Sequence, residues 1–218
     1  MKDLVLLHAA VSSPATWDVV TPALTDLGYR VHTPTLLGHG SAERRRTYTL
    51  DAFRDHLIAD LDHRGLTDIT LIGHSLGAFV ATTIAIAQPT RVNRLILEEL
   101  PIPPRTPTDP GPSDQATPAL LLRALGLMTR RKADPRLLHH AITALRTPNP
   151  TWWSALPTLT APALLLTGGP TSHLTQSRYP VLASTLPTAT THEIPVGHRI
   201  HTKAPTAWLE AITPHLRS

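Results

Sequence analysis

A serine between two glycines, in residues 73–77 (Gly-His-Ser-Leu-Gly), is the first group of this sequence that could perform chemistry. It follows the apolar, β-branched run 69–72 and precedes a proline-free run typical of a helix. Glycines without a Cβ let strand and helix approach each other, and the sharp corner exposes the Ser75 hydroxyl. The N–H groups that open the helix, beginning with Leu76, point at whatever Ser75 attacks. These features predict a nucleophile with half of an oxyanion hole, and the alternative is an ordinary strand–helix turn, in which the five-residue pattern also occurs.

A serine hydroxyl is a weak nucleophile at neutral pH, so it needs a histidine base and an acid that orients the histidine. His198 follows the last predicted strand, and Glu98 and Glu99 end an earlier one. Active groups of an open parallel sheet gather at the carboxyl ends of its strands, so we expect these residues and the loop 8–10 to meet Ser75 there. Neighbouring strand residues point to opposite faces, so only one glutamate can face His198.

Strand-like and helix-like segments alternate along the chain, which predicts an α/β fold with a parallel sheet and right-handed crossovers. The expected strands are 4–7, 29–33, 69–72, 92–97, 163–167 and 192–196, and the expected helices are 16–24, 50–64, 76–88, 120–128, 136–145, 174–186 and 204–216. A proline-rich stretch after Glu99 interrupts this alternation. The sequence therefore predicts a single domain, residues 1–218, with an inserted helical lid at 101–158.

The composition excludes several classes of function. The 218 residues contain no cysteine, which excludes disulfides and thiolate chemistry, and the 13 histidines lack metal-site spacing, so we expect neither metal nor cofactor. The net charge is +4, but the arginines are scattered without interleaved aromatic residues, which argues against nucleic acid. No apolar run approaches the roughly 20 residues of a membrane span, and the N-terminus does not have the pattern of a secretory signal. We expect a cytoplasmic protein without a membrane partner.

Two basic runs, at 44–46 and 130–132, are exceptions to the scattered charge. They are expected to be solvated faces. The alternative is contact with an anionic substrate or an acidic carrier protein.

Four segments resemble the α/β-hydrolase family, in the family's order. Residues 6–17 resemble its HG-x loop that ends in a tryptophan, and residues 34–40 resemble its PDLxGHG loop. Residues 73–77 resemble its nucleophile elbow, and residues 197–208 resemble its terminal segment with the catalytic histidine. The resemblance covers essentially the whole chain. It implies a mostly parallel central sheet of about six strands flanked by helices, with a short helical lid.

The resemblance also implies an oxyanion hole and a catalytic base. The two N–H groups of the hole would belong to Ala10 and Leu76, and the base would be His198. The family usually has glycine after the first histidine of the HG-x loop, where this chain has Ala9. A slight displacement of the backbone is expected there.

The acid of the triad departs from the common family pattern. Where the family normally has G-x-x-D, residues 168–173 contain no carboxylate. Members that resemble haloalkane dehalogenases place the acid after the strand that follows the nucleophile helix, and that pattern aligns with Glu99. Glu98 is the alternative acid. The non-catalytic alternative is a solvated strand end or a salt bridge to Arg94 or Arg199.

These residues predict acyl transfer by a Ser-His-Glu triad, in which Ser75 attacks an ester or thioester carbonyl and water hydrolyses the acyl-enzyme. The expected substrate is a small, largely apolar ester or thioester, free or attached to a carrier. Its expected contacts are Leu125 of the lid, Trp153 at the end of the lid and His74 of the elbow, although Trp153 could instead pack the lid against the sheet. Haloalkane dehalogenase chemistry is not expected, because it needs aspartate at position 75.

Two alternatives keep the same fold. One is a cyclase, lyase or acyltransferase of specialised metabolism, with His198 as the base. The other is a ligand-binding relative without catalysis. The effect of Ser75→Ala and labelling by a serine-reactive phosphonate distinguish them. The sequence does not predict the oligomeric state.

Overall fold

A parallel sheet forms the centre of the protein, whose computed structural model describes residues 1–113 and 118–217. The strand order is β2-β1-β3-β4-β5-β6, and all five neighbouring pairs are parallel. The strands are β1 (Lys2–Leu7), β2 (Tyr29–His32), β3 (Ile69–His74), β4 (Val92–Glu98), β5 (Ala163–Thr167) and β6 (Ala189–Glu193). The prediction of a parallel sheet of about six strands is confirmed.

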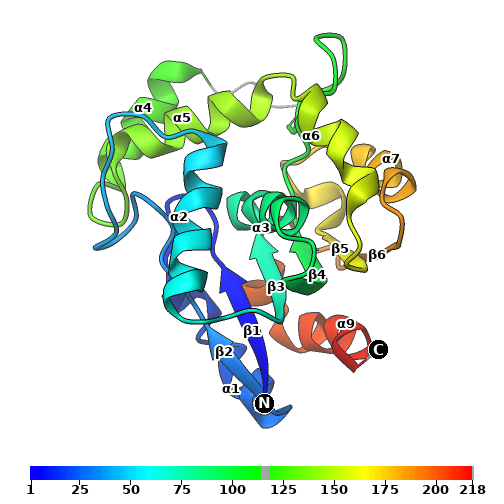
Figure 1. Cartoon of the computed structure of the whole chain (residues 1–218). Helices are drawn as coiled ribbons and strands as arrows, with labels where there is room; N and C mark the ends of the chain where they lie inside the picture. The colour runs from blue at the N-terminus through cyan, green and yellow to red at the C-terminus, as the bar shows by residue number, and fades with distance from the viewer. Residues whose placement is uncertain (114–117, 218) are drawn as a thin grey trace.

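Helices connect the strands and cover both faces of the sheet (Figure 1). They are α1 (Thr21–Asp26), α2 (Leu50–His63), α3 (Leu76–Ala87), α4 (Ala119–Met128), α5 (Pro135–Arg146), α6 (Pro150–Ala155), α7 (Arg178–Thr185), α8 (Ile200–Lys203) and α9 (Pro205–Arg217), with short 3₁₀ helices at Pro14–Trp17, Leu156–Thr158 and Gly169–Thr171. None of the helices in the described ranges combines the length and the apolarity needed to cross a lipid bilayer.

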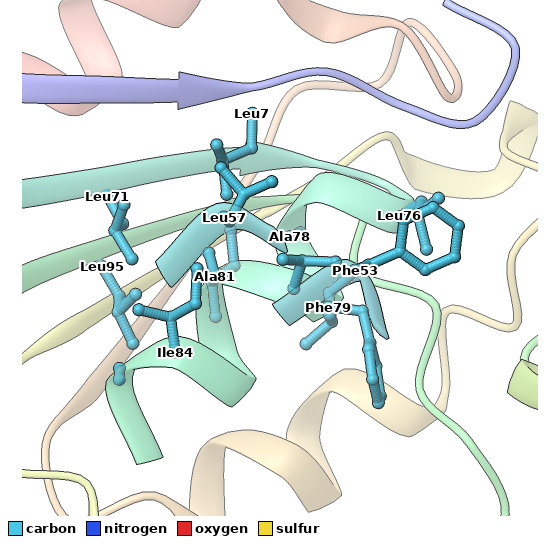
Figure 2. Packing of buried hydrophobic residues seen from close by; sticks show 14 of the residues in the cluster. Leu7, Phe53, Leu57, Leu71, Leu76, Ala78, Phe79, Ala81, Ile84 and Leu95 are labelled. Atoms are coloured by element: carbon cyan, nitrogen blue, oxygen red, sulfur yellow. The ribbon is translucent and has the colours of Figure 1, made fainter. Parts of the chain in front are cut away.

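The period of two along the strands divides the core between the two faces. Val5 and Leu7 pack with α2 and α3 on one face, whereas Leu4 and Leu6 pack with α1 and α9 on the other. Figure 2 shows the first of these clusters, in which side chains of β1, β3 and β4 meet those of α2 and α3. Burial on both faces explains why these strands are continuous apolar runs.

The strand order reverses between β1 and β3. The chain leaves β1 toward β2 on one side and returns to β3 on the other, where Leu7 lies opposite Gly73. A reversal of this kind leaves a crevice at the carboxyl ends of the two strands, which is where open α/β sheets bind ligands. The elbow and the loop 8–10 both start at this crevice.

The chain between β4 and β5 carries α4, α5 and α6. Figure 1 shows α4 and α5 on the side toward which β1 and β3 point. The start of α5 is tied to the loop after β2, because the Asp134 N–H donates to the Gly38 carbonyl over 2.8 Å and the Gly40 N–H donates to the Lys132 carbonyl over 2.9 Å. The assignment of 101–158 as a lid stays a prediction.

Three expected elements differ from the structure. The helix expected at 174–186 is shorter and begins only at Arg178. The helix expected at 16–24 is a 3₁₀ turn, Pro14–Trp17, followed by α1. The last strand lies at Ala189–Glu193 rather than 192–196. It is an edge strand, and most of its residues are exposed. Its threonines pair with β5, whereas the apolar Ile194 and Val196, on which the prediction relied, lie beyond its end.

Candidate active site

Ser75 occupies the corner between β3 and α3. Its backbone has φ 53° and ψ −118°, a conformation that residues other than glycine rarely adopt. Gly73 and Gly77 permit the corner, because a Cβ at Gly73 would overlap the backbone of α3 and a Cβ at Gly77 would overlap the backbone of Leu7. The sequence prediction of a strand, a tight turn and a helix around Ser75 agrees with this geometry.

Three non-glycine residues of the described chain have a positive φ: Val11 at 52°, Ser75 at 53° and Glu99 at 51°. Each directly follows, or lies a few residues beyond, the carboxyl end of a strand. Strained backbone of this kind persists where surrounding contacts enforce it, and it concentrates at functional sites. The strain therefore marks the same edge of the sheet as the motifs do.

Glu99 lies opposite the predicted base. Its Oε2 accepts a hydrogen bond from His198 Nδ1 over 3.1 Å, and its side chain is fully buried. A carboxylate can only accept here, so His198 carries its hydrogen on Nδ1 and leaves Nε2 as the basic nitrogen. The predicted ion pairs of the glutamates with Arg94 or Arg199 are not found among the described residues.

The segment that lacks the family's aspartate donates hydrogen bonds to Glu99. The Gly168 N–H donates to Oε1 over 2.6 Å, and the Ser172 hydroxyl donates to Oε2. Burial alone would raise the pKa of Glu99, but the bonds from His198, Ser172 and Gly168 outweigh it and hold the pKa below its usual value. Glu99 is therefore ionised at neutral pH, and a second carboxylate at 168–173 would repel it.

The loop after β1 is braced by two buried histidines. His8 Nε2 accepts the Leu36 N–H over 3.2 Å, and His39 Nε2 accepts the Val11 N–H over 2.9 Å. Burial lowers the pKa of His8 to about 3 and that of His39 to about 4, so both rings stay neutral and able to accept. Because the Val11 N–H is bound to His39, it is not available to a substrate.

The expected oxyanion donors both line the crevice. Ala10 precedes the strained Val11, and Leu76 is the first residue of α3. Within residues 1–113 and 118–217 no hydrogen-bond acceptor is recorded for the N–H of Ala10, and the N–H of Leu76 has no partner inside the helix because of its position. Both groups are free to bind an oxygen in the cavity.

A cavity of about 610 Å³ joins these groups. Ser75, His198 and residues 9–13 of the loop after β1 line it, together with one face of α5. The described residues contain no hydrogen bond between Ser75 and His198; in structures without substrate such bonds are often long or poorly aligned. The apolar lining on α5 consists of Leu138, Ala141, Ile142 and Leu145, and Arg146 at the end of the same helix also lines the cavity.

Two of the three expected substrate contacts lie outside the lining of this cavity. Leu125 and Trp153 are not among its residues. Leu125 lies 38% exposed on α4, and the buried Trp153 ring donates from Nε1 to the Pro103 carbonyl over 2.8 Å. From the sequence alone, the leucines of α4, the leucines of α5 and the two tryptophans were equal candidates for the cavity wall. Apolar spacing does not tell which helix faces the crevice. The apolar wall belongs to α5 instead.

His74 borders the cavity but is only 3% exposed. Its Nε2 donates to the backbone carbonyl of His198 over 2.7 Å, so it holds the loop that carries the base. Burial lowers the pKa of His74 to about 3, and the ring is therefore neutral. His173, for which the sequence favoured a supporting or exposed position over one in the pocket, also lines the cavity, and its ring centroid lies 4.1 Å from that of His198.

Glu98 faces the other side of β4, as alternation predicts. Its side chain is fully buried and accepts a hydrogen bond from His201 Nδ1 over 2.9 Å. In the described chain, His74, Glu98 and His201 are the metal-ligating types that come together, with ligating atoms within 4.8 Å of one another. Because His74 Nε2 and His201 Nδ1 already donate to protein oxygens, a hydrogen-bond network accounts for this cluster.

Known proteins resemble this chain in sequence. It is 42% identical over 95 residues to a pimeloyl-[acyl-carrier protein] methyl ester esterase of Aromatoleum aromaticum, which covers 44% of this chain and 36% of the relative. It is 34% identical over 129 residues to a pyrethroid hydrolase of Sphingobium wenxiniae, which covers 56% of this chain and 45% of the relative. The aligned segments thus span less than half of the curated relatives.

The fold and a family model cover far more of the chain. An esterase from Exiguobacterium antarcticum superposes with a TM-score of 0.84 at 17% identity, covering 100% of this chain and 92% of that one. The model of the "Alpha/beta hydrolase family" matches residues 4–212. The chain belongs to the alpha/beta hydrolase family.

Proposed function

We propose that the protein is a serine hydrolase that cleaves an ester or thioester of a small, largely apolar substrate through Ser75, His198 and Glu99. The observation that carries this proposal is the hydrogen bond from His198 Nδ1 to the buried Glu99 carboxylate, beside the cavity that Ser75 lines. The esterase and hydrolase names of the relatives support the reaction class.

The proposed reaction begins when His198 Nε2 takes the proton of the Ser75 hydroxyl, whose oxygen attacks the substrate carbonyl. The N–H groups of Ala10 and Leu76 stabilise the negative oxygen of the tetrahedral intermediate. His198 then gives its proton to the leaving alcohol or thiol, and the acyl-enzyme remains. Water, deprotonated by His198, releases the acid and restores Ser75. Glu99 keeps the imidazole in the required tautomer throughout, and no step requires a cofactor or a metal.

The side chains that line the cavity favour an apolar acyl or alcohol portion. Leu138, Ile142 and Leu145 of α5 provide an apolar wall about two turns long. Lys132 and Arg199 add positive charge to the lining, which suits a substrate with an anionic group or one attached to an acidic carrier.

An activity panel tests the proposal. Esters and thioesters with short and long acyl chains are assayed with the wild type and with Ser75→Ala, and the acyl-enzyme is sought by mass spectrometry after rapid quenching. We expect hydrolysis of at least one ester series and a loss of at least about 10³-fold in kcat for Ser75→Ala. Turnover of the same substrate by Ser75→Ala at the wild-type rate would favour a cyclase or lyase with His198 as base. Binding without turnover would favour a ligand-binding relative.

A further inference from the structure

Beside Glu99, His198 and Ser75 lies a second set of a carboxylate, an imidazole and a hydroxyl, formed by Glu98, His201 and Thr16. His201 Nδ1 is 2.9 Å from both carboxylate oxygens of Glu98, and His201 Nε2 is 2.9 Å from Thr16 Oγ1. Glu98 and His201 are fully buried, whereas Thr16 lines the cavity. Thr16 is thus connected to a buried ionisable pair although its own side chain borders the substrate space.

The direction of these hydrogen bonds follows from Glu98. Its carboxylate also accepts the Ile200 N–H over 2.8 Å and the His201 N–H over 3.3 Å, so it is surrounded by donors. Each donor faces a carboxylate oxygen, so Glu98 accepts from His201 Nδ1 and from the two backbone N–H groups alike. An ionised carboxylate only accepts, so His201 carries a hydrogen on Nδ1.

In the tautomer with its hydrogen on Nδ1, the His201 ring presents a bare Nε2 that accepts the Thr16 hydroxyl hydrogen. The ring cannot turn freely, because Trp17 stacks on it with centroids 4.1 Å apart and His74 packs edge-on at 5.1 Å. With its hydrogen held by His201, Thr16 Oγ1 has only acceptor lone pairs to present to the cavity.

We propose that Thr16 is a specificity-determining residue, which binds a hydrogen-bond donor of the substrate, an O–H or an amide N–H. The inference rests on the proposed function and adds a polar contact to it. Ser12, Ser13 and Thr16 add hydroxyl groups to the cavity lining, and the α5 face adds apolar side chains. A substrate with an apolar chain and one hydroxyl or amide matches both.

Matched esters test this inference. The probes are p-nitrophenyl esters with a hydroxyl on the second, third or fourth acyl carbon, each paired with its methoxy counterpart and assayed at mildly alkaline pH. We expect the wild type to favour the hydroxyl ester of at least one pair by about 5-fold to 10-fold in kcat/KM, the worth of one hydrogen bond. Thr16→Val, which removes the hydroxyl at similar size, should abolish the preference, and Thr16→Ser should restore it.

Two further variants sharpen the test. Ser13→Ala removes another hydroxyl of the same lining that has no bond to His201, and it should leave the preference unchanged. Glu98→Gln replaces one of the two carboxylate oxygens that lie 2.9 Å from His201 Nδ1 with an amide N–H, which favours a ring hydrogen on Nε2 that is donated to Thr16. The Thr16 hydrogen is then released toward the cavity, and the preference should fall or reverse toward the methoxy ester.

The outcomes separate this inference from the proposed function. A wild type that hydrolyses the esters without preferring any hydroxyl probe, or a preference that survives Thr16→Val, overturns the role of Thr16 and leaves the triad intact. A wild type that hydrolyses no probe and is not labelled at Ser75 by a fluorophosphonate overturns the proposed function. Calorimetric binding of the paired esters to Ser75→Ala then still decides the role of Thr16, since equal affinities contradict it.

Discussion

Two glutamate–histidine pairs lie on opposite sides of the same strand end, and they differ in what surrounds them. Glu99 pairs with His198, whose side chain is 19% exposed beside Ser75, whereas Glu98 pairs with His201, which is fully buried against Trp17. Both glutamates hold a histidine in the same tautomer. Because only His198 of these two histidines reaches the cavity, we expect the Glu99–His198 pair to exchange protons with a substrate and the Glu98–His201 pair only to orient its neighbours.

The largest effect is expected at the accessible pair. Glu99→Gln places an amide N–H against His198 Nδ1, which shifts the ring hydrogen to Nε2 and removes the base. By analogy with serine proteases, kcat for ester hydrolysis should fall by about 10³-fold to 10⁴-fold with a folded protein. Steady-state kinetics and circular dichroism check this result. Wild-type kcat in Glu99→Gln would exclude Glu99 as the acid.

The same substitution at the buried pair should act mainly on stability. Glu98→Gln weakens bonds to Ile200 and His201, so we expect the free energy of unfolding to fall by about 2 kcal/mol and kcat to fall by no more than about 10-fold. Chemical denaturation and kinetics measure the two effects. Asp3→Asn, which changes a carboxylate–histidine pair at the opposite end of β1, is the matched control and should leave kcat unchanged. A collapse of kcat only in Glu98→Gln would exchange the roles of the two glutamates.

Acid should destabilise the buried surroundings of the site. The pKa values of His8, His39 and His74 are lowered by burial to about 3, 4 and 3, below the ordinary value near 6.5. A depressed pKa contributes stability that is complete above pH 6.5 and is lost as the pH falls toward the folded value, by up to about 1.4 kcal/mol per pH unit for each ring.

Denaturation curves between pH 7 and about 4.5 check this dependence. His39→Gln should reduce the slope, because one titrating ring is gone, while His63→Gln at an exposed position should not. A slope that is the same in His39→Gln as in the wild type would contradict the neutral state of His39.

The smallest effects are expected from substitutions on α4 and α5. These helices differ as the two pairs do, because α5 borders the cavity and α4 does not. Ile142→Ala on the cavity face of α5 should lower kcat/KM for long acyl chains by about 10-fold and spare short ones, because an apolar contact is lost. Leu120→Ser on α4, where the side chain is 80% exposed, should change the free energy of unfolding by less than about 0.5 kcal/mol and leave kcat/KM unchanged. A chain-length effect in Leu120→Ser alone would place the acyl site on α4.

The sheet and the elbow could be predicted because their signals are local. Apolar runs define the buried strands, and the glycines at 73 and 77 are needed wherever helix and strand backbones touch. The edge strand Ala189–Glu193 was placed about three residues too late, since its exposed threonines carry no apolar signal. Sequence alternation also indicated that the two glutamates face opposite sides.

The surroundings of the triad were harder to predict, because they depend on contacts between distant segments. Nothing local in Thr16 or His201 indicates that the two side chains meet across 185 residues of chain. The pairing of two consecutive glutamates with histidines three positions apart, His198 and His201, is a signal that could have been used. The choice between α4 and α5 as the cavity wall had no signal of this kind.

Covalent labelling tests the central claim most directly. The wild type, Ser75→Ala and Glu99→Gln are incubated with a fluorophosphonate, and the adduct is located by peptide mass spectrometry with the rate of labelling measured. We expect one adduct, on Ser75, no adduct in Ser75→Ala, and labelling of Glu99→Gln slowed by at least about 100-fold. An unlabelled wild type, or an adduct on another residue, would contradict the proposed Ser75, His198 and Glu99 triad.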